Sequence, residues 1–449
     1  MTEEINLQRV KVESYMEHIN YQKCVPVESE YDVLVTGAGP SGICAAVAAA
    51  RTGARTAIIE RYGAVGGNLT VGSVGPIMGN VGRGTMRDEL TGLLSVGFND
   101  MQGITGRLHD TENAKGILIE FLHKEGVEVY LQTPVVDTIV ENNCVMGVIA
   151  GKKEGLRAIL ADIVVDATGD GDTAYFAGAA YEIGREGDGL TQPVTLMYTL
   201  AGVDEATALT CQGEEDNVTL RGERFLDFTA RCCKQGILPE NTQSVRLYKS
   251  NVPGERHVNT TQANGVLPTD SRAVMQAELV LRKQIEQVTD FLRRYVPGYQ
   301  NCYIKTTAST LGVRESRRFT GEYVLNDNDL RNGRRFNDVV VHDANCVIDI
   351  HNPTGGGQAE GLPEVVKPYD IPYRCLIPEK IDNLILSGRC ISGTHRAHAS
   401  YRIMSICMAI GEAAGVAAAL SSRLGVNPRK LDYKKVQQVL IEKGIVLFD

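Results

Sequence analysis

The segment DVLVTGAGPSG, residues 32–42, joins a short apolar, β-rich run to a Gly-x-Gly-x-x-Gly motif. An Ala-rich run follows and ends at Gly53, which is typical of a helix closed by a glycine stop signal. Residues 55–60, RTAIIE, predict a second buried strand. A strand, a helix and a strand in this order form a β-α-β unit and predict a parallel sheet.

The spacing of the glycines matches a dinucleotide-binding turn. Gly37 allows the tight turn, Gly39 lets the backbone approach a pyrophosphate, and Gly42 lets the helix pack closely on the strand. The N-terminus of the helix adds N–H groups and a positive dipole end. Glu60 ends the second strand, roughly 20 residues beyond Gly37, where such motifs place an acid on the ribose hydroxyls.

The rest of the chain predicts an α/β fold: a Rossmann-like domain with a parallel sheet and a β-meander, plus an inserted α+β substrate domain. Runs at 134–141, 144–151 and 157–169 are separated by turn signals, and the last run is expected to return to the main sheet. Residues 273–295 have the periodicity of a helix. The predicted domains are an N-terminal arm (1–30, with room for one helix), the dinucleotide domain (31–177 and 371–449) and the substrate or cap domain (178–370).

Composition excludes several classes of protein. The chain has 46 Lys and Arg against 55 Asp and Glu, a net charge of −9, which argues against nucleic-acid and anionic-membrane partners. The 11 cysteines form no Cys-x-x-Cys pair, so we expect reduced thiols, no metal site and a cytoplasmic location. The charged N-terminus does not resemble a secretory signal. The apolar run at 403–420 contains Glu412 and predicts a buried helix rather than a membrane span.

Three further blocks favour a dinucleotide longer than NAD. Directly after Glu60 come Arg61 and a second glycine-rich turn, Gly66-Gly67-Asn68, and residues 164–172 read VVDATGDGD. Residues 383–415 predict a strand that ends at Gly388-Arg389 and then a long helix of small residues.

Together these blocks resemble the flavoproteins with a glutathione-reductase-type FAD domain. The likeness is to the FAD-dependent oxidoreductases, whose relatives include the flavin subunit of heterodisulfide reductase and the fumarate reductase flavoproteins. It covers residues 28–82, 112–202, 303–325 and 370–420. It implies FAD as cofactor and a C-terminal helix whose N-terminus faces the pyrimidine side of the flavin. The residues expected to bind FAD are Gly37, Gly39, Pro40, Ser41, Gly42, Glu60, Arg61, Gly66, Gly67, Asn68, Val135, Thr168, Gly169, Asp170, Gly388 and Arg389.

The blocks that are missing also guide the functional prediction. No second Gly-x-Gly-x-x-Gly follows a strand, and no redox cysteine pair lies on the first helix. We therefore expect hydride to pass directly between FAD and a small organic substrate. A histidine can take a proton near neutral pH and an arginine can hold a carboxylate or an oxyanion. The candidate catalytic residues on this ground are His395, His398, Arg402, His351 and Arg314.

Two alternatives remain at this point. The chain could be a flavin-binding electron-transfer or RNA-modifying subunit that acts with a partner, although its acidity speaks against RNA. An NAD(P)-dependent dehydrogenase would explain the first motif but not the blocks at 163–172 and 383–415. The sequence leaves open the substrate, the direction of reaction, the electron acceptor, covalent attachment of FAD through a His or Cys, and self-association.

Overall fold

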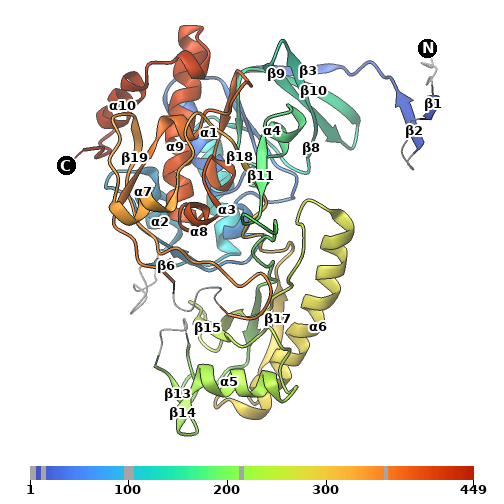
Figure 1. Cartoon of the computed structure of the whole chain (residues 1–449), viewed down its shortest axis with the longest axis vertical. Helices are drawn as coiled ribbons and strands as arrows, with labels where there is room; N and C mark the ends of the chain where they lie inside the picture. The colour runs from blue at the N-terminus through green and yellow to red at the C-terminus, as the bar shows by residue number, and fades with distance from the viewer. Residues whose placement is uncertain (1–6, 12–16, 96–105, 212–216, 358–362, 449) are drawn as a thin grey trace.

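A computed structural model describes residues 7–11, 17–95, 106–211, 217–357 and 363–448 (Figure 1). The elements form two bodies, each around its own buried core: a larger body of helices around a sheet and a smaller body below it in Figure 1. The described part of the arm is a hairpin of β1 (Leu7–Lys11) and β2 (Glu17–Tyr21), which stands apart from both bodies. The described part of the arm is therefore a strand pair and not a helix.

The main sheet has the predicted parallel part and the predicted meander. Its strands run in the order β7 (Glu128–Tyr130), β4 (Thr56–Ile59), β3 (Val27–Thr36), β10 (Gly155–Asp166), β9 (Cys144–Lys152) and β8 (Val135–Glu141). β21 (Leu384–Leu386) pairs with the end of β10. The pairs β7–β4, β4–β3, β3–β10 and β10–β21 are parallel. The first half of β10 pairs antiparallel with β9, so this one strand belongs to both the meander and the parallel sheet.

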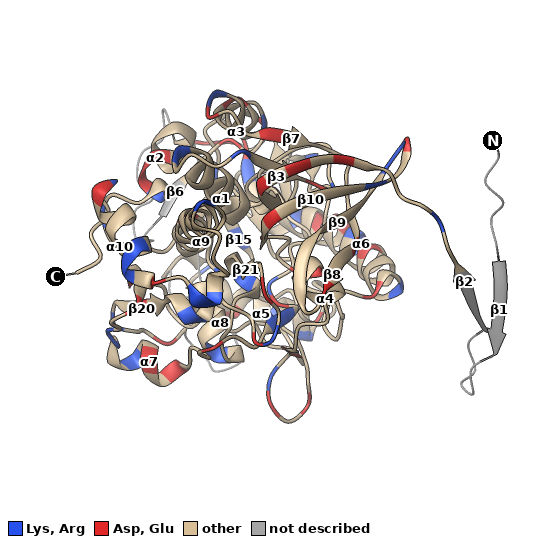
Figure 2. Ribbon diagram, turned by 90° about the horizontal axis from the view of Figure 1, so that it is seen from above, with Lys and Arg blue, Asp and Glu red and all other residues tan. Residues whose placement is uncertain are grey.

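Two apolar helices form the centre of the larger body. α1 (Pro40–Arg51) follows β3, and α9 (Met404–Leu424) lies beside it, as Figure 2 shows in a view along α9. Gly411 and Gly415 make this close approach possible, because a Cβ at either position would lie 2.0 Å from the carbonyl oxygen of Ser41 or Ala45 on α1. α9 is long and apolar enough to cross a membrane, but 94% of its most apolar window is buried inside the protein. It is therefore the core helix that the sequence predicted.

The smaller body is an antiparallel sheet covered by helices. The strand order is β15 (Arg246–Lys249), β16 (Arg256–Asn259), β12 (Tyr198–Ala201) and β17 (Tyr303–Thr307). α5 (Phe225–Lys234) and α6 (Ser271–Tyr295) supply its helical layer. The Asp270 side chain caps α6 by accepting from two backbone N–H groups of the first turn.

The second core is narrower than the predicted range 178–370. Its buried residues run from Val194 to Leu311, whereas residues 319–350 contribute buried side chains to the first core. β19 (Val339–Ala344) explains the difference, because its apolar residues pack on α9 of the larger body. The remaining elements are β5 (Pro76–Met78), α2 (Met86–Leu94), β6 (Gly106–Leu108), α3 (Asn113–Lys124), α4 (Asp172–Phe176), β11 (Tyr181–Ile183), β13 (Thr219–Leu220), β14 (Glu223–Arg224), β18 (Arg317–Phe319), α7 (Asp327–Asn332), β20 (Tyr369–Pro372), α8 (His395–Tyr401) and α10 (Tyr433–Glu442).

Candidate functional site

A pocket opens at the carboxyl ends of β3, β4, β10 and β21, the edge where open parallel sheets bind ligands. The smaller body closes one wall of the pocket through residues 310–314. The predicted cofactor residues that line it are Gly37, Gly39, Pro40, Ser41, Glu60, Arg61, Gly67, Asn68, Val135, Thr168, Gly169, Gly388 and Arg389. Three others, Gly42, Gly66 and Asp170, lie behind this lining.

The glycine turn has the geometry that a pyrophosphate requires. Gly37 has φ +90°, and a Cβ there would lie 2.6 Å from the carbonyl oxygen of Ala167. A Cβ on Gly42 would lie 1.8 Å from the carbonyl oxygen of Gly37, so this glycine is needed for the helix to start so close to the strand. Gly39, by contrast, has open space in front of it. A phosphate can therefore approach the backbone at Gly39 while its two neighbours hold the turn.

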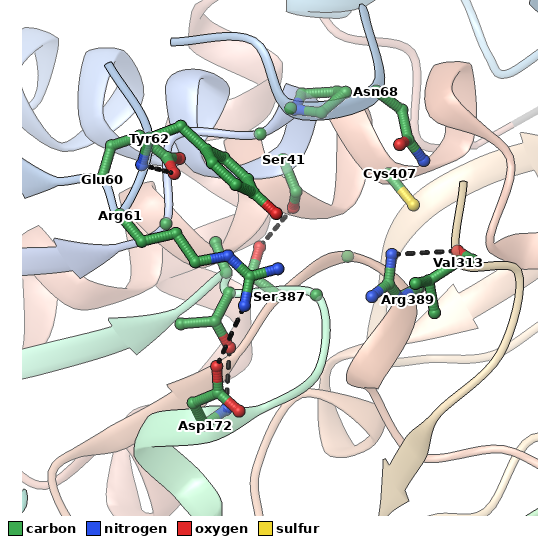
Figure 3. A pocket seen from close by; sticks show the side chains of 18 of the residues that line it. Ser41, Glu60, Arg61, Tyr62, Asn68, Asp172, Val313, Ser387, Arg389 and Cys407 are labelled. Atoms are coloured by element: carbon green, nitrogen blue, oxygen red, sulfur yellow. Dashed lines mark hydrogen bonds and ion pairs between the residues drawn. The ribbon is translucent and has the colours of Figure 1, made fainter. Parts of the chain in front are cut away.

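Glu60 is a buried carboxylate at the start of the pocket. It accepts hydrogen bonds from the backbone N–H groups of Ala38 (2.7 Å) and Tyr62 (2.9 Å), as Figure 3 shows for Tyr62. Burial raises its pKa above the ordinary value. Each carboxylate oxygen can accept more than one hydrogen bond, so Glu60 keeps acceptor capacity for a pair of ribose hydroxyls.

Two arginines flank the middle of the pocket. Arg61 lies 3.6 Å from Asp170 and 3.8 Å from Asp172. Arg389 forms an ion pair with Asp170 and donates to the carbonyl oxygen of Val313 (3.1 Å; Figure 3). Although burial opposes it, the charges of Arg389 and Arg61 hold the pKa of Asp170 below its usual value. Asp170 thus positions the two arginines rather than lining the pocket.

The start of α9 forms the other end of the pocket. Met404 and Cys407, both in its first turn, line the cavity, and no side chain caps that turn. The free N–H groups and the positive dipole end therefore favour negative charge here. The Ser41 and Ser387 hydroxyl groups share a hydrogen bond of 2.6 Å, which fastens the glycine turn to the strand before α9 (Figure 3).

The five candidate catalytic residues divide into two groups. Arg314 and Arg402 line the pocket, whereas the three histidines do not. His395 points its Nδ1 at Glu315 (2.8 Å). His398 is fully buried, neither ring nitrogen has a hydrogen-bond partner among the described residues, and burial holds its pKa far below the usual value. α8 thus turns both side chains away from the cavity.

His351 lies one layer behind the pocket, with Nε2 at 3.3 Å from the carboxylate of Asp349. The same carboxylate lies 3.3 Å from Arg402. Burial and the charge of Arg314 lower the pKa of His351, which keeps the ring neutral near pH 7. The sequence analysis did not single out Asp349, nor Gln192, whose side-chain oxygen accepts from Arg402 (3.4 Å). Neither belongs to a motif, and only the folded chain brings them to Arg402.

Comparison with known proteins assigns the class of this site. The chain belongs to the FAD dependent oxidoreductase family, whose sequence model matches residues 32–440, and FAD is its cofactor. The glycine turn, Glu60 and the uncapped start of α9 fit that cofactor, and these are the residues that would hold its pyrophosphate, ribose and flavin ring.

Individual relatives are similar over parts of their length. The chain is 46% identical over 55 residues to the dihydrolipoyl dehydrogenase of Trypanosoma brucei brucei, which is 12% of this chain and 12% of that protein. It is 28% identical over 181 residues to the thiamine thiazole synthase of Pyrococcus horikoshii, 38% of this chain and 68% of that one. Among solved structures, a geranylgeranyl bacteriochlorophyll reductase-like protein from Thermoplasma acidophilum aligns over 93% of this chain and 84% of its own, at 14% identity and a TM-score of 0.49.

Proposed function

We propose that this oxidoreductase transfers a hydride directly between bound FAD and a small organic substrate held in the same pocket. One observation carries the proposal: Arg314 of the smaller body and Arg402, just before α9, line one cavity together with the start of α9. Two guanidinium groups on one cavity wall can hold a small polar or acidic molecule.

FAD, when bound, supplies the two-electron chemistry. The chain supplies the rest. Arg314 and Arg402 orient the substrate, and the N-terminus of α9 would stabilise negative charge on a flavin held at this end of the pocket. Residues 310–313 close the pocket from the other side and keep water from the reacting atoms. Behind the pocket, Asp349 pairs with both Arg402 and His351 and so positions the Arg402 guanidinium.

The reaction proposed is oxidation of a C–H bond that bears a hydroxyl or amine, or the reverse reduction. In the forward direction the C–H bond breaks, both of its electrons leave with the hydrogen to FAD, and the proton of the adjoining O–H or N–H is released. The net charge of −9 supports a small-molecule substrate rather than a nucleic acid or an anionic membrane. The unpaired cysteine pattern supports a cytoplasmic location.

The test is the reductive half-reaction of the purified holoprotein without oxygen. Hydroxy acids, amino acids, alcohols and amines are mixed with it in turn, and loss of the visible flavin absorption is followed. The proposal expects at least one class to bleach the flavin, and deuterium on the reacting carbon to slow the bleaching. If only a second protein reduces the flavin, electron transfer from a partner replaces the proposal.

A further inference from the structure

We propose that Arg314 and Arg402 form a carboxylate-binding subsite at the flavin end of the pocket, so that the substrate is a small carboxylic acid. The inference rests on the proposed function and adds the chemical class of the molecule that it acts on.

Three distant segments meet at this subsite. Arg402 follows α8, and Arg314 follows the strand-rich smaller body. The segment Gln192-Pro193 connects them: Arg314 donates to the carbonyl oxygen of Pro193 (2.8 Å), and Arg402 donates to the side-chain oxygen of Gln192 (3.4 Å). Both guanidinium groups are therefore held in place from behind while they line the same cavity.

Positive charge exceeds negative charge around the subsite. Arg402 shares the carboxylate of Asp349 with His351, and Arg246 of β15 also acts on that carboxylate. Among the described residues, Arg314 has no carboxylate within ion-pair distance. Its sequence neighbour Glu315 is occupied elsewhere, because it accepts from Arg318, His395 and the backbone of Gln192.

The electrostatics of Arg314 agree with a missing anion. Burial and the nearby charge of Arg402 lower its pKa to about 9, so its cation is destabilised but still present at pH 7. Tyr248 and Asp349 are the other charged or titratable groups that act on it, besides Arg246. A bound anion would offset the excess positive charge and stabilise the cation of Arg314.

Two buried donors also lack an acceptor. The Nε of Arg402 and the side-chain N–H₂ of Gln192 have no hydrogen-bond partner among the described residues. The oxygen of Gln192 already accepts from Arg402 and from the backbone N–H of His351 (3.2 Å), which fixes the orientation of the amide. Buried donors are normally satisfied. The cluster behind the pocket, which Arg402 lines, therefore contains more hydrogen-bond donors than acceptors.

Binding to the oxidised holoprotein tests the subsite without any turnover. Formate, acetate, propionate and benzoate are the probes, and formamide, acetamide, propionamide and benzamide are their uncharged counterparts. We expect at least one acid to perturb the visible flavin spectrum saturably, and its amide to leave the spectrum unchanged. Sulfate is the third probe, because it is an anion without the planar carboxylate shape.

Substitution of Arg314 assigns the effect to this site. Arg314→Gln is expected to weaken binding of the acid by about tenfold or more, because a charged hydrogen bond is lost. Arg314→Lys is expected to restore part of the affinity. Arg282→Gln, on the exposed face of α6, is the matched control and should bind as the parent does. Flavin content and melting temperature check that each variant is folded.

Other outcomes overturn the inference. If no acid binds, if acids and amides bind alike, or if folded Arg314→Gln binds as the parent does, the subsite is refuted. Sulfate that binds as tightly as the acids and depends on Arg314 would refute the carboxylate class. Bleaching by uncharged alcohols alone would refute the subsite but keep hydride transfer, whereas acid binding without bleaching by any substrate would keep the subsite and refute hydride transfer.

Discussion

Glu60 shows how one side chain can both hold a turn and hold a ligand. Its carboxylate accepts from the N–H groups of Ala38 and Tyr62 and also lines the pocket. In Glu60→Gln one amide nitrogen must face a donor, so one of these contacts is lost. We expect the affinity for FAD to fall by about tenfold or more, since a charged hydrogen bond contributes about 1.5–3 kcal/mol.

The measurement is a fluorescence titration of the FAD-stripped protein with FAD. Glu186→Gln, at an exposed position, is the control and should leave the affinity unchanged. An unchanged affinity in Glu60→Gln would show that this carboxylate is structural only.

At this scale the sequence predicted residues that belong to local motifs. Gly37, Gly39 and Glu60 are recognisable because their spacing within one β-α-β unit brings them to the same edge of the sheet, and Arg389 because its block resembles a motif of the FAD-dependent oxidoreductases. The histidines are different. His395 and His398 stand close to α9 in sequence, yet the orientation of α8 turns them toward Glu315 and the core, and no local pattern encodes that orientation.

The close packing of α9 on α1 makes this helix pair sensitive to small substitutions. In Gly411→Ala the new methyl group would lie 2.0 Å from the carbonyl oxygen of Ser41, so α1 and α9 must separate. Overpacking of this kind costs about 1–3 kcal/mol, and we expect a lower melting temperature and weaker retention of FAD. Gly116→Ala in α3 is the matched control, because open space surrounds that glycine. It should stabilise the helix by about 0.5–1 kcal/mol. Equal melting temperatures for the two variants would contradict the close approach.

α9 also carries a pH-dependent group. Glu412 is buried, accepts from the backbone N–H of Met86 (2.7 Å), and burial raises its pKa to about 7. The folded protein then keeps a proton that the unfolded chain releases near pH 4.5, so this group makes stability fall as the pH rises from 4.5 to about 7. The difference amounts to about 3 kcal/mol.

Glu412→Gln should remove this dependence and be more stable than the parent at pH 8, but not at pH 4.5. Melting temperatures across this range, with exposed Glu379→Gln as control, measure the effect. Parallel pH profiles for Glu412→Gln and the parent would show that Glu412 is ionised throughout.

The elements themselves were mostly predictable. The β-α-β unit, the meander and the helices at 271–295 and 404–424 all have strong periodicity or clear turn signals. The position of β19 in the larger body could not be predicted, because a short apolar strand carries no information about which core will cover it.

For the whole molecule, the pocket is the place where the two bodies meet. Leu311 lies in the second core and lines the cavity, while the opposite wall belongs to the first core. We expect FAD to couple the two bodies. The stripped protein should unfold in two calorimetric transitions, and saturating FAD should merge them at a higher temperature, since a ligand at 100 times its Kd adds about 2.7 kcal/mol. If FAD raises the temperature of only one of the two transitions, the wall formed by the smaller body contributes nothing to binding.

The hydrogen bond between Ser41 and Ser387 joins residues 346 positions apart, and this separation matters while the protein is being made. The glycine turn leaves the ribosome long before the strand and helix that complete its pocket, β21 and α9, have been made. Until then a nascent chain exposes the face of α1 that later packs on α9, and chaperones have that long to act on it. The synthesis of α9, rather than the appearance of the glycine motif, sets the moment at which the new protein can retain its cofactor.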